Sequence, residues 1–147
     1  MYSKILVPLD GSQTAEAILN DVQELALKLD AEVVLFQAIE SLADTLTGSH
    51  IALDIARQAV EEDRQRAHAY LDQVAERLRS AGVKVTTHVG EGPAAVSILS
   101  HCRSENVSMV AMTTHGRSGL RRTVFGSVAD EIMRDSHLPV LMMRPST

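Results

Sequence analysis

Residues 113–127 combine several features that bind phosphate groups in proteins. The stretch contains three spaced glycines, Gly116, Gly119 and Gly126, and three arginines in a chain whose net charge is −5. Glycines let backbone N–H groups approach an anion closely, and a helix that begins after Gly126 would direct its positive end toward that anion. The pattern therefore predicts an oxyanion cradle. The alternative is a long surface connection with solvated arginines.

A carboxylate stands in a comparable position much earlier in the chain. Asp10 follows a short apolar run and precedes Gly11 and Ser12. Its carboxylate could bind ribose hydroxyls, or hold Mg²⁺ beside phosphate oxygens, because hard cations take carboxylate ligands. A purely local role is also open, in which Asp10 caps Ser12 and the first turn of the following helix.

Short aliphatic runs of the kind that form strands precede both stretches. Five such runs cover residues 4–9, 32–38, 84–89, 108–113 and 140–143. Between them, apolar residues recur every three or four positions, which predicts helices over 12–29, 52–80, 92–105 and 127–136. This alternation predicts an α/β fold, with one open five-stranded parallel sheet covered by helices on both faces. At this length we expect one domain over residues 1–147.

The strands differ in the arrangement of their apolar residues. The runs 4–9, 32–38 and 108–113 are apolar on both faces, as central strands of a parallel sheet should be. The run 84–89 alternates apolar and polar residues, which is typical of an edge. Val140–Met143 is apolar on both faces but comes last, where the other edge is expected. Because an exposed apolar edge invites pairing, we predict a homodimer through this last strand.

The helical stripes indicate which residues should face the sheet. In the helix over 12–29 the stripe runs from Ala15 to Leu29, with Ser12 as the expected N-cap. In the helix over 52–80 the stripe includes Ile55 and Ala59.

The topology predicts where a ligand would bind. In an open parallel sheet, ligands bind outside the carboxyl ends of the strands, where the winding direction reverses. Asp10 follows the first strand and Thr113 ends the fourth, which are both central strands, so we expect them to border one site. Candidates for orienting an attacking group are Asp10, Thr114 and His115, and none has an evident partner in the sequence. We therefore expect no efficient phosphoryl-transfer catalysis, and slow hydrolysis at most.

Composition and other motifs exclude several functions. The longest apolar runs span four or five residues, whereas a membrane helix needs about twenty, so no membrane span is expected. An acidic chain with two tyrosines, two phenylalanines and no tryptophan should not bind nucleic acid. No export signal precedes the first strand, which predicts a cytoplasmic protein. The sequence contains no G-x-x-x-x-G-K-[ST] motif, which excludes a P-loop ATPase.

The order of motifs along nearly the whole chain resembles the universal stress protein family, in its UspA-like, ATP-binding subgroup. The matching segments are Ile5-Leu6-Val7-Pro8-Leu9-Asp10-Gly11-Ser12, Thr114-His115-Gly116-Arg117-Ser118-Gly119, Gly126-Ser127-Val128-Ala129 and Pro139-Val140-Leu141. ATP-binding members of the family carry Gly, two residues, Gly, nine residues, then Gly-Ser or Gly-Thr. Gly116 and Gly126-Ser127 match this pattern, whereas Thr113 replaces the first glycine.

The resemblance implies a Rossmann-like sheet of order 3-2-1-4-5, a dimer through the last strands, and ATP as ligand. With Asp10 as a carboxylate beside the phosphates, we expect Mg²⁺ to accompany the ATP. It implies that Pro8 and Asp10 flank the adenosine and that the backbone of Ala38 binds adenine. The residues implied to line ribose and phosphates are Thr113, Thr114, His115, Gly116, Arg117, Ser118 and Gly119. The residues implied to present a helix N-terminus to the β- and γ-phosphates are Gly126, Ser127, Val128 and Ala129.

The resemblance thus implies a regulatory protein in which ATP occupancy modulates oligomerisation or an effector protein, such as a transporter or an enzyme. The effector itself is not identified by the sequence. A nucleotide-free dimeric interaction module of the same fold is the alternative, and Thr113 is the feature that favours it. A slow ATPase is a third possibility.

Overall fold

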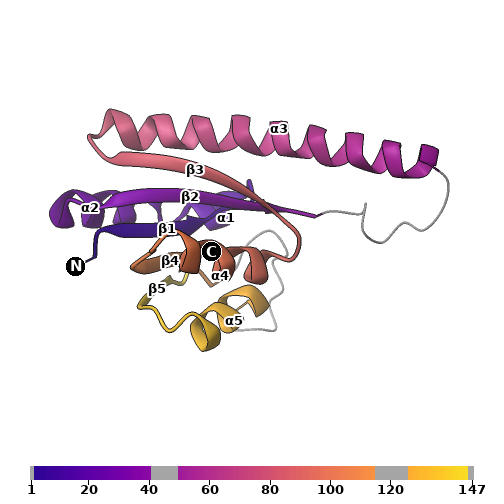
Figure 1. The fold of residues 1–147 in the computed structure, drawn as a ribbon. Helices are drawn as coiled ribbons and strands as arrows, with labels where there is room; N and C mark the ends of the chain where they lie inside the picture. Colours follow the sequence, from indigo (N-terminus) through magenta and orange to yellow (C-terminus); the bar gives the residue numbers. More distant parts are fainter. Residues whose placement is uncertain (1, 41–49, 115–125, 146–147) are drawn as a thin grey trace.

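The computed structural model describes residues 2–40, 50–114 and 126–145. Its centre is a five-stranded sheet in which every neighbouring pair of strands is parallel (Figure 1). The strands are β1 (Lys4–Pro8), β2 (Glu32–Ile39), β3 (Lys84–Glu91), β4 (Met109–Thr113) and β5 (Val140–Met143). Their order is β3-β2-β1-β4-β5, so the predicted α/β fold and strand order are confirmed.

Helices cover both faces of this sheet, as predicted. They are α1 (Gln13–Glu16), α2 (Leu19–Leu29), α3 (His50–Ser80), α4 (Ala94–Ser104) and α5 (Ser127–Asp135). Side chains of α1, α2 and α3 pack together on one face, and those of α4 and α5 pack on the other. In Figure 1, α3 runs above the sheet and α5 lies below it.

The central strands are buried because both of their faces are apolar. In β1, Ile5 and Val7 belong to the core beneath α2 and α3, whereas Leu6 belongs to the core beneath α4 and α5. All three side chains are completely buried. Cys102 of α4 is also buried in this second core, and burial raises the pKa of its thiol to about 11. A thiol of that kind stays protonated and behaves as a small apolar residue.

Two details of the helices differ from expectation. The predicted helix over 12–29 is broken, because the Ala17 N–H bonds to the Thr14 carbonyl three residues earlier at 3.2 Å and closes α1 after a single turn. The predicted apolar stripes also extend beyond the parts of the helices that are buried against the sheet. Leu29 lies at the end of α2 and is 40% exposed, while Ile55 in α3 is 64% exposed and Ala59 is exposed as well.

The length of α3 explains the exposed stripe. Its 31 residues extend about 46 Å, whereas the eight residues of β3 extend about 26 Å. The first turns of α3 therefore project beyond the sheet, as the right-hand part of Figure 1 shows. Among the described residues, no helix combines the length and the apolar character needed to cross a bilayer.

Candidate functional site

The turn after β1 is built around a carboxylate. The N–H and the hydroxyl of Ser12 both donate to Oδ1 of Asp10, at 3.0 and 2.5 Å. The Ser12 hydroxyl oxygen in turn accepts the N–H of Ala15 at 3.1 Å and so caps α1, as predicted. Gly11, between them, has φ +85°, a conformation that side chains disfavour. The local capping role of Asp10 is thus present in the structure.

The end of β4 and the start of α5 are joined by main-chain hydrogen bonds. The N–H of Thr114 donates to the Met143 carbonyl at 2.9 Å, and the N–H of Gly126 donates to the Thr114 carbonyl at 2.7 Å. A Cβ on Gly126 would lie 3.0 Å from that carbonyl oxygen, so glycine allows this close approach. Gly126 is the N-cap of α5 and has no side chain with which to cover the first amides of the helix.

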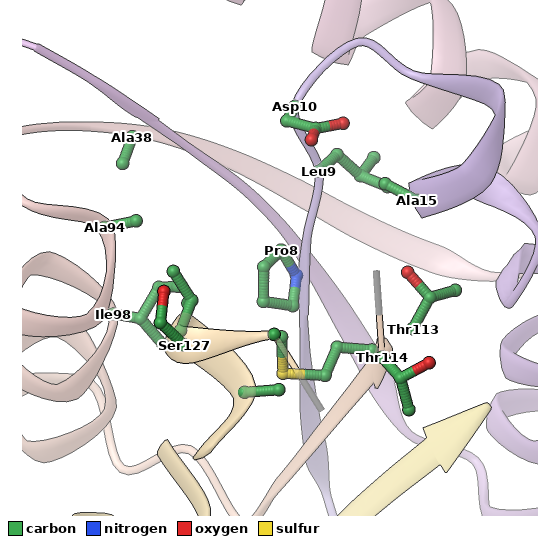
Figure 2. Close-up of a pocket in the computed structure, with 14 residues that line it drawn as sticks. Pro8, Leu9, Asp10, Ala15, Ala38, Ala94, Ile98, Thr113, Thr114 and Ser127 are labelled. Atoms are coloured by element: carbon green, nitrogen blue, oxygen red, sulfur yellow. The ribbon is translucent and has the colours of Figure 1, made fainter. Parts of the chain in front are cut away.

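A cavity of about 300 Å³ lies where these two structures meet, at the carboxyl ends of the strands. In Figure 2, Pro8 lies in the middle of the lining, with Ala38 and Ala94 on one side and Thr113 and Thr114 on the other. We call this cavity the crest cavity. The predicted site residues that line it are Pro8, Asp10, Ala38, Thr113, Thr114, Gly126, Ser127, Val128 and Ala129. Two segments more than 100 residues apart in the sequence therefore border one hollow.

The remaining predicted site residues fall outside the part of the chain that the structure describes. These are His115, Gly116, Arg117, Ser118 and Gly119. Their proposed contacts with ribose and phosphates stay predictions.

Sequence reasoning missed part of the lining. The additional residues are Leu9, Ala15, Ala94, Ile98 and Met112. Ala94 and Ile98 come from α4, whose first residue follows Pro93 at the same edge of the sheet. A usable signal existed, since every helix that follows a parallel strand begins at the carboxyl edge. The same rule that places the start of α5 at this edge also places the start of α4 there.

The lining combines apolar walls with polar groups at defined positions. Pro8, Ala38 and Ile98 present small or flat apolar surfaces, whereas Thr113 and Thr114 carry hydroxyl groups and are both about 5% exposed. The amides at the start of α5 favour negative charge. The arrangement suits a ligand with a flat apolar ring system at one end and an anionic group at the other.

The described residues do not form a metal site of their own. Within 2–40, 50–114 and 126–145, no group of three or more His, Cys, Asp or Glu side chains is arranged to hold a metal ion. Asp10 is the acidic residue on the described lining of the crest cavity, and its Oδ1 already accepts two hydrogen bonds from Ser12. A cation here would therefore depend mainly on oxygens that the ligand brings.

Comparison with known proteins gives consistent results. The model of the family described as "Universal stress protein family" matches residues 1–144. Universal stress protein MJ0531 of Methanocaldococcus jannaschii is 27% identical over 144 residues, which cover 98% of this chain and 83% of that protein. The solved structure of MJ0577 from the same organism is 25% identical, has a TM-score of 0.88, and is matched over 100% of this chain and 99% of its own.

A more distant structure contains a nucleotide. The universal stress protein from Archaeoglobus fulgidus in complex with dAMP is 19% identical to this chain and has a TM-score of 0.70. The match covers 97% of this chain and 98% of that one, so the two proteins share the whole fold.

Proposed function

Because the chain belongs to the universal stress protein family, we propose that it binds an adenine nucleotide in the crest cavity. The observation that carries this proposal is the meeting of the Asp10 turn and the start of α5 on one cavity. An apolar hollow of about 300 Å³ suits the adenosine part, and the amides at the start of α5 suit the phosphates. The dAMP bound to the Archaeoglobus fulgidus protein supports the same ligand class.

ATP is the nucleotide we propose, with Mg²⁺ as its counter-ion. In this arrangement Pro8 and Asp10 would flank the adenosine, the Ala38 backbone would bind adenine, and Ser127 would lie near the terminal phosphates. Mg²⁺ would be held mainly by phosphate oxygens, with Asp10 as the carboxylate from the described lining.

Nucleotide occupancy would act through assembly or through an effector protein. A groove of about 680 Å³ runs beside β5, and its apolar lining includes Met109, Leu141 and Met143. We propose that a second copy of the chain covers this β5 edge and forms a homodimer. ATP can shift this assembly, or the binding of an effector, only if it binds the assembled and separate forms with different affinity.

The first test is binding by the wild-type protein. Isothermal titration calorimetry with ATP, AMP and GTP, with and without Mg²⁺, measures affinity and base preference. ATP at a hundred times its dissociation constant should stabilise the protein by about 2.7 kcal/mol, which raises the thermal midpoint by about 5–10 °C. Absence of binding by every adenine nucleotide would overturn the proposal.

A matched pair of variants locates the site. Ala94→Leu adds bulk at the first residue of α4, inside the crest cavity, whereas Ala59→Leu makes the same change on the exposed surface of α3. We expect Ala94→Leu to weaken ATP binding at least about tenfold and Ala59→Leu to leave it unchanged. Circular dichroism controls for folding. Equal affinities in the two variants would contradict the location.

The second candidate is a nucleotide-free dimeric module. Thr113 lines the crest cavity with a side chain where the ATP-binding pattern has glycine, and this observation favours the candidate. Thr113→Gly distinguishes the two. If the threonine blocks the cavity, the variant binds ATP and the wild type does not.

A further inference from the structure

The turn that carries Asp10 is held by contacts from α3, which has no residue in the described lining of the crest cavity. α1 has four residues, and a helix of that length is not stable alone. Its last residue, Glu16, accepts hydrogen bonds from two side chains of α3. The Tyr70 hydroxyl donates to Oε2 of Glu16 at 2.8 Å, and the Arg77 guanidinium donates to Oε1 at 3.2 Å. These two bonds attach α1 to α3.

Tyr70 also lies beside the turn itself. A second cavity, of about 770 Å³, has a lining that includes Asp10, Gly11, Ser12 and Tyr70. Burial raises the pKa of the Tyr70 hydroxyl above its ordinary value. The hydrogen bond to Glu16 and the charges of Glu16 and Asp10 raise it further, while a hydrogen bond with the Gly11 backbone opposes the rise. The hydroxyl therefore remains protonated and keeps donating to Glu16.

The segment that Tyr70 holds is the segment that borders the crest cavity. Asp10 and Ala15 both line that cavity, and both are joined through Ser12, which bonds to each of them. We propose that Tyr70 is a positioning residue for the crest cavity, whose hydroxyl fixes α1 through Glu16 and thereby keeps the Asp10 turn in its ligand-binding geometry. This inference rests on the proposed function for the identity of the ligand. Tyr70 itself is not part of the described lining of the crest cavity.

Removal of the Tyr70 hydroxyl tests whether its hydrogen bond to Glu16 positions the Asp10 turn. Tyr70→Phe keeps the ring and removes the hydroxyl, and Tyr2→Phe makes the same change at an exposed tyrosine near the N-terminus. We expect Tyr70→Phe to weaken ATP binding about five- to tenfold, since a hydrogen bond to a charged group is lost. Tyr2→Phe should leave the affinity unchanged. Calorimetry well below the thermal midpoint keeps both variants folded.

Variants of Glu16 separate positioning from general stabilisation. Glu16→Gln keeps an acceptor for the Tyr70 hydroxyl and should retain most of the affinity, whereas Glu16→Ala should behave like Tyr70→Phe. In an Asp10→Ala background, Tyr70→Phe should cause no further loss of affinity, because the group that it positions is absent. A contact that merely stabilises the fold would lower the thermal midpoint in both backgrounds and leave affinity unaffected.

A measurement without nucleotide keeps this inference separate from the proposed function. Amide hydrogen exchange at Ser12 and Ala15 reports the order of the turn, because both N–H groups are bonded within it. We expect Tyr70→Phe to speed exchange at these two amides about tenfold and to leave Val22 in α2 unchanged. The positioning role of Tyr70 is overturned if Tyr70→Phe leaves amide exchange at Ser12 and Ala15 unchanged, or if this variant binds ATP with wild-type affinity. Failure of the wild type to bind any adenine nucleotide overturns the proposed function instead.

Discussion

The two edges of the sheet are built differently. β3 has eight residues, and two arginines of α3 reach its main chain: Arg79 donates to the Val85 carbonyl at 2.8 Å and Arg64 to the Val89 carbonyl at 3.4 Å. β5 has four residues, Leu141 is 39% exposed, and no described side chain bonds to its main chain. Two main-chain carbonyls of β3 are thus bonded by the chain's own cations, whereas β5 is apolar and, among the described residues, partly exposed.

If the proposed homodimer forms, this difference indicates which edge of the sheet would pair. Unpaired strand edges are templates for another chain, and proteins protect them with charged side chains. Arg64 also forms an ion pair with Glu91 at the end of β3, so that its guanidinium is held in place. If the chain forms the proposed homodimer, the bonded carbonyls of β3 favour pairing at β5, and a dimer made through that one edge would be a closed pair.

The largest expected effect comes from a charge on the open edge. Leu141→Lys would place an ammonium group within the apolar contact of the proposed dimer, which is costly without a partner. We expect dimer affinity to fall about a hundredfold or more, with the monomer remaining folded. Sedimentation velocity over a range of concentrations measures this. Leu27→Lys, at a leucine of α2 that is 48% exposed, is the matched control. A dimer that survives Leu141→Lys would remove β5 from the interface.

Opening the covered edge should have a smaller effect in the opposite direction. The double change Arg64→Ala and Arg79→Ala frees the carbonyls of Val89 and Val85, and we expect species larger than the dimer at high protein concentration. Arg77→Ala is the control, because Arg77 lies on the same helix but bonds to Glu16 and not to β3. Light scattering detects the larger species. If the control and the double variant associate equally, loss of charge and not the freed edge is the cause.

The division into central and edge strands was predictable because burial of a strand leaves a direct trace in sequence, whereas the full strand order was implied by the resemblance to the family. A central strand such as β1 must be apolar on both faces, and β3 alternates because it lies at an edge. The arginines that cover β3 gave no such trace. Arg64 lies 25 residues from Val89 and on a helix with many charges, so its role depends on the orientation of α3.

The crest cavity was predictable for similar reasons, but its support was not. Asp10 and Gly126 follow or precede regular elements at the carboxyl edge, where topology brings ligand-binding groups together. Tyr70 and Glu16 are 54 residues apart and belong to different helices. Glu16 is the last residue of α1, and nothing in the local periodicity of residues 12–29 indicated that a helix ends there.

A pair of histidines beside β3 should make stability depend on pH. His88 of β3 and His101 of α4 have ring centres 4.2 Å apart, and both rings contact Phe36. Burial lowers the pKa of both histidines. Lys4 and His88 lower that of His101 further, Arg64 and His68 lower that of His88, and Glu105 opposes the decrease in both.

The sign of the pH effect follows from these shifts. The unfolded chain binds these protons more readily than the folded chain. The contribution of the two histidines to the free energy of unfolding is therefore present above their ordinary pKa of about 6.5 and is lost as the pH falls below it. Thermal midpoints measured between pH 7.5 and 5 should decrease, and the double change His88→Gln and His101→Gln should reduce that decrease. His50→Gln, at an exposed histidine of α3, should not. An identical pH profile in the double variant would show that other groups titrate.

The smallest effect is expected for the charges around the β5 groove. Glu24 and Lys28 of α2 form an exposed ion pair of 2.8 Å beside this groove, and their hydrogen bond lowers the pKa of Glu24 and raises that of Lys28. Such pairs at the wet rim of an interface contribute little, because water solvates them in either state. At physiological salt, Lys28→Ala should therefore change the dimer dissociation constant by less than about twofold. The thermal midpoint should stay close to that of the wild type. If Lys28→Ala weakened the dimer as much as Leu141→Lys, charge and not apolar contact would hold the β5 edge, and the contrast with β3 would be reversed.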